Sequence, residues 1–325
     1  MYVLGIDGGG TKTTAAICDI EGNIQALTTV GPTNPNNPDA KVQDEFDQLV
    51  SNLRDINDCA LTNVSVIFAG MSGVNRSEDK LRVKQAIFKA LNREVTFFSD
   101  NDAVNALYSG TLGEPGIVHI AGTGSITFGI NHENQRSRVG GWGYLIGDEG
   151  SGYDIGKKAI QAVFAAYDQT GPQTSLTDLI LEHAMVLEPP DLISEIYEPG
   201  KAKSLIAPIS KLVFKAADVG DEVAQKIILD AARSTAESTY YLYMKLFQRQ
   251  QGLIPLILAG GVYKRADWFL PTLEQVMNEK KLPISIVVPK VVPAAGALVA
   301  GFKLSGKTVP TVFLEKCMNN GLKQK

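Results

Sequence analysis

The sequence predicts an α/β protein in which helices cover central mixed sheets, built as two related halves. An apolar, β-branched segment opens the chain and ends in three glycines at 8–10. Strand-like and helix-like segments then alternate, which is typical of α/β layers. Residues 116–130 repeat the opening pattern of strand, glycine turn and strand. The repeat predicts two halves of similar plan that face one another.

The first third contains short apolar runs, broken by turns, and segments with helical periodicity. We predict strands at 2–6, 13–20, 24–30, 64–69 and 95–98 and helices at 39–56, 77–91 and 101–109. The first three strands follow one another closely and predict an antiparallel meander.

The rest of the chain predicts a second α/β domain with a helical insertion. We predict strands at 116–121, 126–130, 254–259 and 284–288, helical segments within 151–250, and helices at 266–280 and 293–304. The predicted domains are therefore residues 1–115 and 116–325, with the break near Leu112–Gly116.

Composition excludes several classes of protein. The 325 residues are 44% hydrophobic and 20% charged, with a formal net charge of −4, so nucleic acid or an anionic membrane is not an expected partner. No signal peptide and no membrane-spanning run is expected. The three cysteines and three histidines are scattered, which argues against disulfides or a Cys/His metal site and indicates a cytoplasmic setting.

Two glycine turns are candidate phosphate loops. In the first, Asp7 precedes Gly8, Gly9, Gly10, Thr11, Lys12 and Thr13; in the second, Gly122, Thr123, Gly124 and Ser125 follow an apolar strand. Glycines let backbone N–H groups approach an anion, and Asp7 could hold Mg²⁺ that arrives with a nucleotide. The alternative is a pair of ordinary hairpins. Because a glycine turn of this kind occurs in each half, the sequence favours two loops that hold one polyphosphate.

Asp100 and Asp102 lie where an apolar strand gives way to a helix. Ser99 or Asp100 would serve as the helix N-cap. Because one cap is enough, capping does not explain why a second aspartate is present. The carboxyl ends of such strands are where α/β sheets place ligands. A carboxylate there is a candidate base for an attacking hydroxyl.

Three further glycine segments need an interpretation. Gly140–Gly152 contains Trp142, which is either core or site, and Asp148, a candidate acceptor for sugar hydroxyls. Gly260 and Gly261 follow a strand, either as a plain turn or beside an adenosine ring. Residues 301–308 match G-x-x-x-x-G-K-[ST], but they continue a predicted helix and lack the strand that a P-loop requires.

Taken together, these motifs resemble the N-acetylglucosamine kinase branch of the sugar kinase/actin/Hsp70 superfamily, over residues 1 to about 303. The resemblance implies two ribonuclease H-like (actin-like ATPase) domains with a cleft between them. It implies ATP and Mg²⁺ as cofactors, with Asp7 near the metal through water and Gly260 and Gly261 at the adenosine. Asp102 matches the catalytic base. The implied sugar contacts are Asn34, Ser72, Asp102, Trp142 and Asp148.

The expected activity is ATP-dependent phosphorylation of the 6-hydroxyl of an amino sugar, in carbohydrate metabolism or cell-wall recycling. N-acetylglucosamine, N-acetylmuramic acid and glucosamine remain alternatives, and a homodimer is one open oligomeric state. The alternative from another class is an ATP-switch activator of the 2-hydroxyacyl-CoA dehydratase type. Members of that class carry an iron–sulfur cluster on cysteines, and Cys18, Cys59 and Cys317 show no such arrangement.

Overall fold

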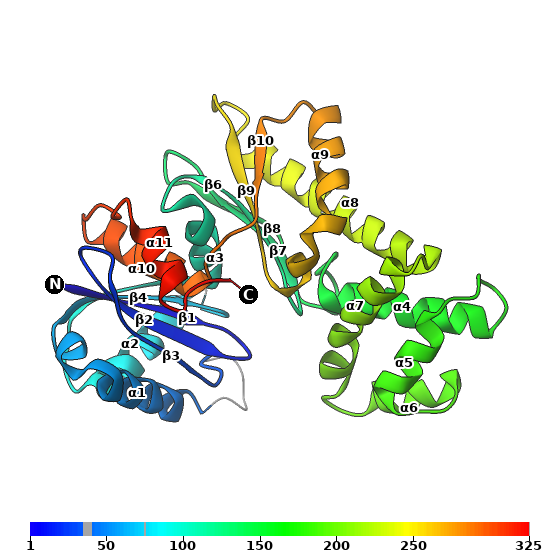
Figure 1. The fold of residues 1–325 in the computed structure, drawn as a ribbon, viewed down its shortest axis with the longest axis horizontal. Helices are drawn as coiled ribbons and strands as arrows, with labels where there is room; N and C mark the ends of the chain where they lie inside the picture. Colours follow the sequence, from blue (N-terminus) through cyan, green and yellow to red (C-terminus); the bar gives the residue numbers. More distant parts are fainter. Residues whose placement is uncertain (35–40, 75, 325) are drawn as a thin grey trace. The chain divides into compact units, whose positions relative to one another are not determined.

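The computed structural model describes residues 1–34, 41–74 and 76–324. The chain forms two compact units, Met1–Glu114 together with Pro289–Lys325, and Pro115–Val288 (Figure 1). Each unit contains one five-stranded mixed sheet with helices, which confirms the predicted fold class.

The sheet of the first unit has the order β3-β2-β1-β4-β5. Strands β1 (Tyr2–Gly8), β2 (Thr13–Asp19) and β3 (Ile24–Val30) form the predicted antiparallel meander. Strand β4 (Val64–Met71) pairs parallel with β1, and β5 (Thr96–Asn101) pairs parallel with β4. The carboxyl ends of β1, β4 and β5 therefore meet at one edge of the sheet.

The second sheet repeats this plan with the order β10-β9-β6-β7-β8. Strands β6 (Gly116–Ala121), β7 (Ser125–Ile130) and β8 (Arg136–Gly140) are antiparallel. Strands β9 (Ile254–Ala259) and β10 (Ile284–Val287) continue the sheet in parallel from β6. Both sheets thus place three antiparallel strands before two parallel ones; the sequence predicts the repeated strand, glycine turn and strand, but not the third antiparallel strand, β8.

Helices cover both sheets. Those of the first unit are α1 (Val42–Thr62), α2 (Ser77–Leu91), α3 (Asp102–Thr111), α10 (Pro293–Leu304) and α11 (Phe313–Asn319). Those of the second are α4 (Gly152–Tyr167), α5 (Leu176–Ala184), η1 (Pro189–Asp191), α6 (Leu192–Tyr197), α7 (Ala202–Asp218), α8 (Glu222–Leu246), η2 (Gly261–Trp268) and α9 (Leu270–Glu279).

Alternation along β1 explains how the first sheet is covered on both faces. Leu4 and Ile6 are fully buried in a cluster with Phe46 of α1. Intervening residues point to the opposite face, where a Cβ on Gly5 would lie 2.7 Å from the backbone nitrogen of Leu298. Helix α10 therefore packs directly on β1, on the side opposite α1 in Figure 1.

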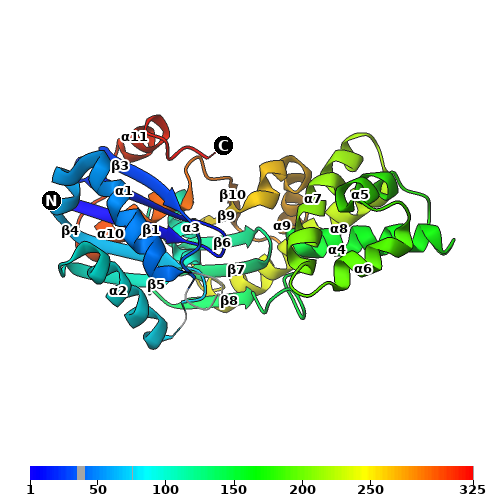
Figure 2. The same ribbon diagram turned by 90° about the horizontal axis from the view of Figure 1, so that it is seen from below.

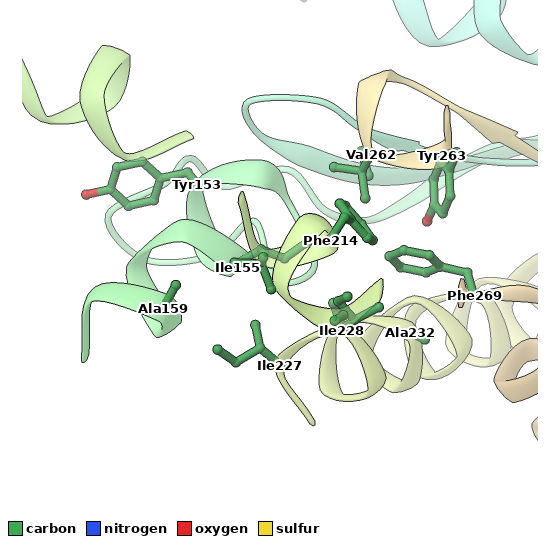
Figure 3. Close-up of a cluster of buried hydrophobic side chains, with 14 of the residues drawn as sticks. Tyr153, Ile155, Ala159, Phe214, Ile227, Ile228, Ala232, Val262, Tyr263 and Phe269 are labelled. Carbon is green, nitrogen blue, oxygen red and sulfur yellow. The ribbon is translucent and has the colours of Figure 1, made fainter. Parts of the chain in front are cut away.

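The helical insertion supplies most of the second core. Helix α8 packs along β7 and β8, and α4 and α7 pack closely on each other (Figure 2). Figure 3 shows aromatic and aliphatic side chains from α4, α7, α8, η2 and the cap of α9 converging, among them Phe214, Ile228, Tyr263 and Phe269. This buried cluster fixes η2, which directly follows the Gly260–Gly261 turn.

The compact units differ from the predicted domains at the C-terminal end. The break after Glu114 lies beside the predicted one, but residues 289–325, assigned by sequence to the second domain, belong to the first unit. The reason is packing: α10 is buried against β1, β4 and α3.

Several elements also differ from the sequence-based prediction. Strand β8 and helix α11 were not predicted. The predicted helix 266–280 divides into η2 and α9, with non-helical backbone at Arg265. Helix α1 extends to Thr62, but its backbone is non-helical at Asn57, directly after the predicted end at residue 56. Within the ranges given above, no helix has the length and apolar character needed to cross a membrane.

Candidate active site

The first glycine loop is a tight hairpin between β1 and β2. The Gly9 N–H donates to the Lys12 carbonyl at 2.9 Å, and Thr11 and Lys12 are exposed at its tip. Thr13 is fully buried, and its hydroxyl lies 2.7 Å from the hydroxyl of Thr33. The loop therefore presents Thr11 and Lys12 to solvent, whereas Thr13 anchors its base.

Polar residues meet at the carboxyl edge of the first sheet. Asp7 of β1 stands beside Gly70 of β4, and Gly70 stands beside Asp100 of β5. The Ser72 N–H donates to the Gly8 carbonyl at 2.7 Å, so the turn after β4 is tied to the first glycine loop. Asp7, Ser72 and the start of α3 are thereby brought together at this edge.

Asp102 is the first residue of α3, and the helix cap differs from the prediction. Asn101 is the N-cap, and its side chain accepts from the Ala103 N–H at 3.0 Å. Ser99 and Asp100 belong to β5 instead, because the strand continues to Asn101. Asp102 is thus not the N-cap of α3, although its carboxylate also accepts backbone hydrogen bonds from Ala103 and from its own N–H.

Burial sets the protonation of both carboxylates at this edge. Burial raises the pKa of Asp102 to about 6, and hydrogen bonds from the backbone N–H groups of Ala103 and Asp102 and from the Ser72 side chain oppose the shift. Burial also raises the pKa of Asp7 to about 7, opposed by a hydrogen bond from Asn105 and increased by the nearby charge of Asp102. A carboxylate that titrates near neutral pH suits a general base.

Asn34 lies beside the same turn. A Cβ on Gly73, whose φ is +78°, would come within 2.6 Å of the Asn34 Oδ1, so the two residues are in close contact. Asn34 directly follows Thr33, which is held by Thr13. The structure therefore gathers Asn34, Ser72 and Asp102 within the first unit.

The second glycine loop is joined to the end of the Gly140–Gly152 segment. The N–H groups of Gly152 and Tyr153 donate to the carbonyls of Gly122 and Thr123, at 2.8 and 3.3 Å. The Ser125 hydroxyl donates to the Glu149 carbonyl at 2.8 Å. Two segments that the sequence suggests as separate sites, one for phosphate and one for sugar, are thus one hydrogen-bonded assembly.

Asp148 is central to this assembly and is mostly buried, with 7% of its surface exposed. Its carboxylate accepts from the Gly143 N–H at 3.2 Å and from the Ser125 backbone. A Cβ on Gly124 would lie 2.5 Å from the Asp148 Oδ2, so only glycine permits this approach. Burial raises the pKa of Asp148, and these backbone donors oppose the shift.

Trp142 is a surface residue, which rules out the core position that the sequence left open. Its side chain is 65% exposed, and the Arg138 guanidinium stacks 4.3 Å from the ring centroid. An exposed aromatic ring in a glycine loop is available to a ligand.

The Gly260–Gly261 turn lies against the strand that leads into the second glycine loop. Gly260 has φ +105°, and a Cβ there would be 2.3 Å from the carbonyl oxygen of Ala121. Beyond the turn, the Tyr263 hydroxyl lies 2.6 Å from His119 Nδ1 and 3.1 Å from the Thr235 hydroxyl. Burial lowers the pKa of His119 to about 3, so the ring is neutral. Sequence reasoning missed this network and treated His119 as an ordinary position.

The segment 301–308 that matches the P-loop pattern is not a P-loop. Gly301–Leu304 are the last residues of α10, Ser305 is its C-cap, and the Lys307 N–H donates back to the Phe302 carbonyl at 2.9 Å. The Lys307 N–H therefore completes the end of a helix. The sequence predicts this outcome, because the matching segment follows a helix and a P-loop requires a preceding strand.

Neither the acidic groups nor the cysteines form a protein-only metal centre in the part of the chain that the structure describes. The cysteines are free: Cys18 and Cys317 are buried and Cys59 is exposed. Asp7 remains as a carboxylate at a strand end near Asp102. This donor set fits Mg²⁺ held mainly by phosphates and water, since Mg²⁺ commonly uses only one or two protein carboxylates.

Residues 4–301 match the model of the BadF/BadG/BcrA/BcrD ATPase family. The chain belongs to this family. An N-acetyl-D-glucosamine kinase from Dictyostelium discoideum is 35% identical over 305 residues, which is 90% of this chain and 95% of that protein. An N-acetylmuramic acid/N-acetylglucosamine kinase from Clostridium acetobutylicum is 34% identical over 299 residues, covering 92% and 97%.

A solved structure supports the fold of this family member. The crystal structure of a candidate N-acetylglucosamine kinase from Porphyromonas gingivalis aligns with a TM-score of 0.70 and 19% identity, over 98% of this chain and 99% of that one. The two-unit architecture with paired mixed sheets is therefore that of a known kinase-like fold.

Proposed function

We propose that this protein is an ATP-dependent kinase that phosphorylates the 6-hydroxyl of an amino sugar, with N-acetylglucosamine as the preferred substrate. The observation that carries the proposal is the cluster of Asn34, Ser72 and Asp102 at one sheet edge, where burial raises the pKa of the Asp102 carboxylate although Asn101 is the helix cap. Sugar kinases among the relatives support the choice of substrate class.

Asp102 acts as the general base in the proposed reaction. It accepts the proton of the sugar hydroxyl, whose oxygen then attacks the γ-phosphorus in line. The Ser72 side chain, hydrogen-bonded to Asp102, orients the carboxylate. Because the transition state is largely dissociative, positioning and neutralisation of charge contribute most of the rate enhancement.

The proposed nucleotide contacts come from the glycine segments of each unit. N–H groups of Gly8–Thr13 and Gly122–Ser125 and the exposed hydroxyls of Thr11 and Thr123 bind phosphate oxygens, and Gly260 and Gly261 leave room for the adenosine. Mg²⁺, when bound with ATP, neutralises charge on the phosphates. Asp7 is the residue that would contact it through water.

The proposed sugar contacts are Asn34, Ser72, Trp142 and Asp148. An acetamido group has one donor and one acceptor beyond the hydroxyls, which the amide of Asn34 can match. A site built for such groups penalises an analogue that leaves them unpaired. The free cysteines suit a reducing compartment, so we assign the protein to the cytoplasm.

The test is an ADP-release screen with ATP and Mg²⁺ over N-acetylglucosamine, N-acetylmuramic acid, glucosamine and glucose, with the mass of each product measured. We expect kcat/KM for N-acetylglucosamine to exceed that for glucose by about 10²-fold or more. Equal activity on glucose contradicts an amino-sugar kinase. Slow ADP release that is independent of sugar supports an activator-type ATPase instead.

A further inference from the structure

Asn105 is a fully buried amide on α3, one helical turn after Asp102 and on the same helix face. Its Nδ2 donates to the Asp7 Oδ1 at 2.7 Å. The same nitrogen lies 3.0 Å from the Gly70 carbonyl and 3.4 Å from the Ile6 carbonyl. One side chain thus joins the ends of β1 and β4 to the helix that begins with Asp102.

The orientation of this amide is determined by its surroundings. Three acceptors surround Nδ2, so a flipped amide would place its oxygen against the Asp7 carboxylate and two carbonyls. Asn105 Oδ1 is buried and has no hydrogen-bond partner among the described residues. An unpartnered buried oxygen costs stability. The arrangement keeps the bond to the Asp7 carboxylate and leaves the amide oxygen without a partner.

The backbone around Asn105 is shaped to admit it. A Cβ on Gly70 would lie 2.1 Å from the Asn105 Oδ1, and a Cβ on Gly296 of α10 would lie 1.9 Å from the Asn105 carbonyl oxygen. Glycine is therefore required on both sides of the residue. The amide and the helix backbone that carries it are held from β4 and from α10.

We infer that Asn105 is a positioning residue that holds the Asp7 carboxylate, through one of its oxygens, in the place from which Asp7 supports the metal–nucleotide complex. The inference rests on the proposed function, because it concerns the residue assigned there to Mg²⁺. Partners that orient a metal-contacting carboxylate commonly alter metal affinity by about 10–100-fold when they are removed.

The test compares ATP binding with Mg²⁺ and with EDTA, by calorimetry and without sugar. Asn105→Leu removes the donor and keeps the volume, and Asn105→Ala removes both. Mg²⁺ raises the ATP affinity of the parent by some factor, and we expect this factor to be about 10–100-fold smaller in each variant. The ATP affinity measured in EDTA should stay close to that of the parent. In the Asp7→Asn background, adding Asn105→Leu is expected to cause no further loss. Ser109→Ala is the control, because Ser109 is buried on the same helix and donates to Ala106 instead.

Three results overturn the inference. One is that Mg²⁺ increases the ATP affinity of both variants by the same factor as in the parent. Another is an equal loss of affinity with Mg²⁺ and with EDTA, which indicates general damage. The third is unfolding of both variants while Asp7→Asn folds normally, which assigns Asn105 to stability alone. Sugar-dependent ADP release by the parent tests the proposed function separately, since the binding assay contains no sugar.

Discussion

At the scale of single residues, burial gives Asp102 the pKa that the proposed chemistry needs. The Asp102→Asn variant is expected to lower kcat by about 10²–10⁴-fold while it retains ATP binding, because it removes the group that accepts the hydroxyl proton. Steady-state kinetics and calorimetry measure the two effects. Asp100→Asn is the matched control on the adjacent strand. Normal turnover in Asp102→Asn with an inactive Asp100→Asn reverses the two assignments.

The same burial makes the ionised carboxylate a cost to the fold. The pKa of Asp102 is raised from 3.8 to about 6, so the folded state binds more protons than the unfolded state between these values. Stability from this group is therefore present below pH 3.8 and lost as pH rises through about 6. We expect Asp102→Asn to raise the Tm at pH 8 and to change it much less at pH 4, close to the unfolded-state pKa. Thermal unfolding at both values is the measurement, and a Tm lowered equally at each contradicts the argument.

At the scale of elements, the two glycine loops of the second unit depend on Asp148. Its carboxylate accepts from the backbone of Gly143 and Ser125, one residue in each loop. Asp148→Ala is therefore expected to raise the KM for ATP as well as the KM for the sugar, by about tenfold or more each, since charged hydrogen bonds are the stronger ones. The measurement is the KM for ATP and the KM for the sugar in the parent and in the variant. A defect confined to the sugar assigns Asp148 to sugar binding alone.

The contact between η2 and β6 gives a second prediction at this scale. Tyr263→Phe removes the hydroxyl that lies 2.6 Å from His119 and leaves a buried ring nitrogen without that partner. We expect a loss of about 1–3 kcal/mol in the free energy of unfolding and a raised KM for ATP. Denaturant unfolding and kinetics measure these. Tyr241→Phe, at a side chain 57% exposed on α8, is the control. Unchanged stability in Tyr263→Phe would contradict a structural role for the network.

At the scale of the whole molecule, the first unit is built from both ends of the chain and the second from one continuous segment. Residues 115–288 are expected to fold alone and to unfold cooperatively. Residues 1–114 are not, because they leave the face of β1 that α10 covers exposed to water. Circular dichroism and thermal unfolding of the two fragments test this. Cooperative unfolding of 1–114 alone means that α10 and α11 are dispensable for the fold.

The amino-acid sequence by itself determined the strands other than β8, most helix positions and the places of the glycine loops. These depend on neighbours in the chain: β-branched runs form strands, glycines form turns, and Pro293 begins α10. The family motifs led to Asp7, Asp102 and the loops because motif residues are close in sequence. The sequence could not assign Trp142 to the core or to the site, since no local pattern shows whether a side chain is exposed.

Only the tertiary structure decided which distant residues meet. Four contacts could not be predicted from the sequence: α10 packs back on β1, Asp148 joins two glycine loops, Tyr263 pairs with His119, and the Asn105 amide donates to Asp7. The physical reason is that hydrogen bonds and close approaches between residues far apart in the chain leave no spacing or period in the sequence. They exist only once the sheets bring those residues to one edge.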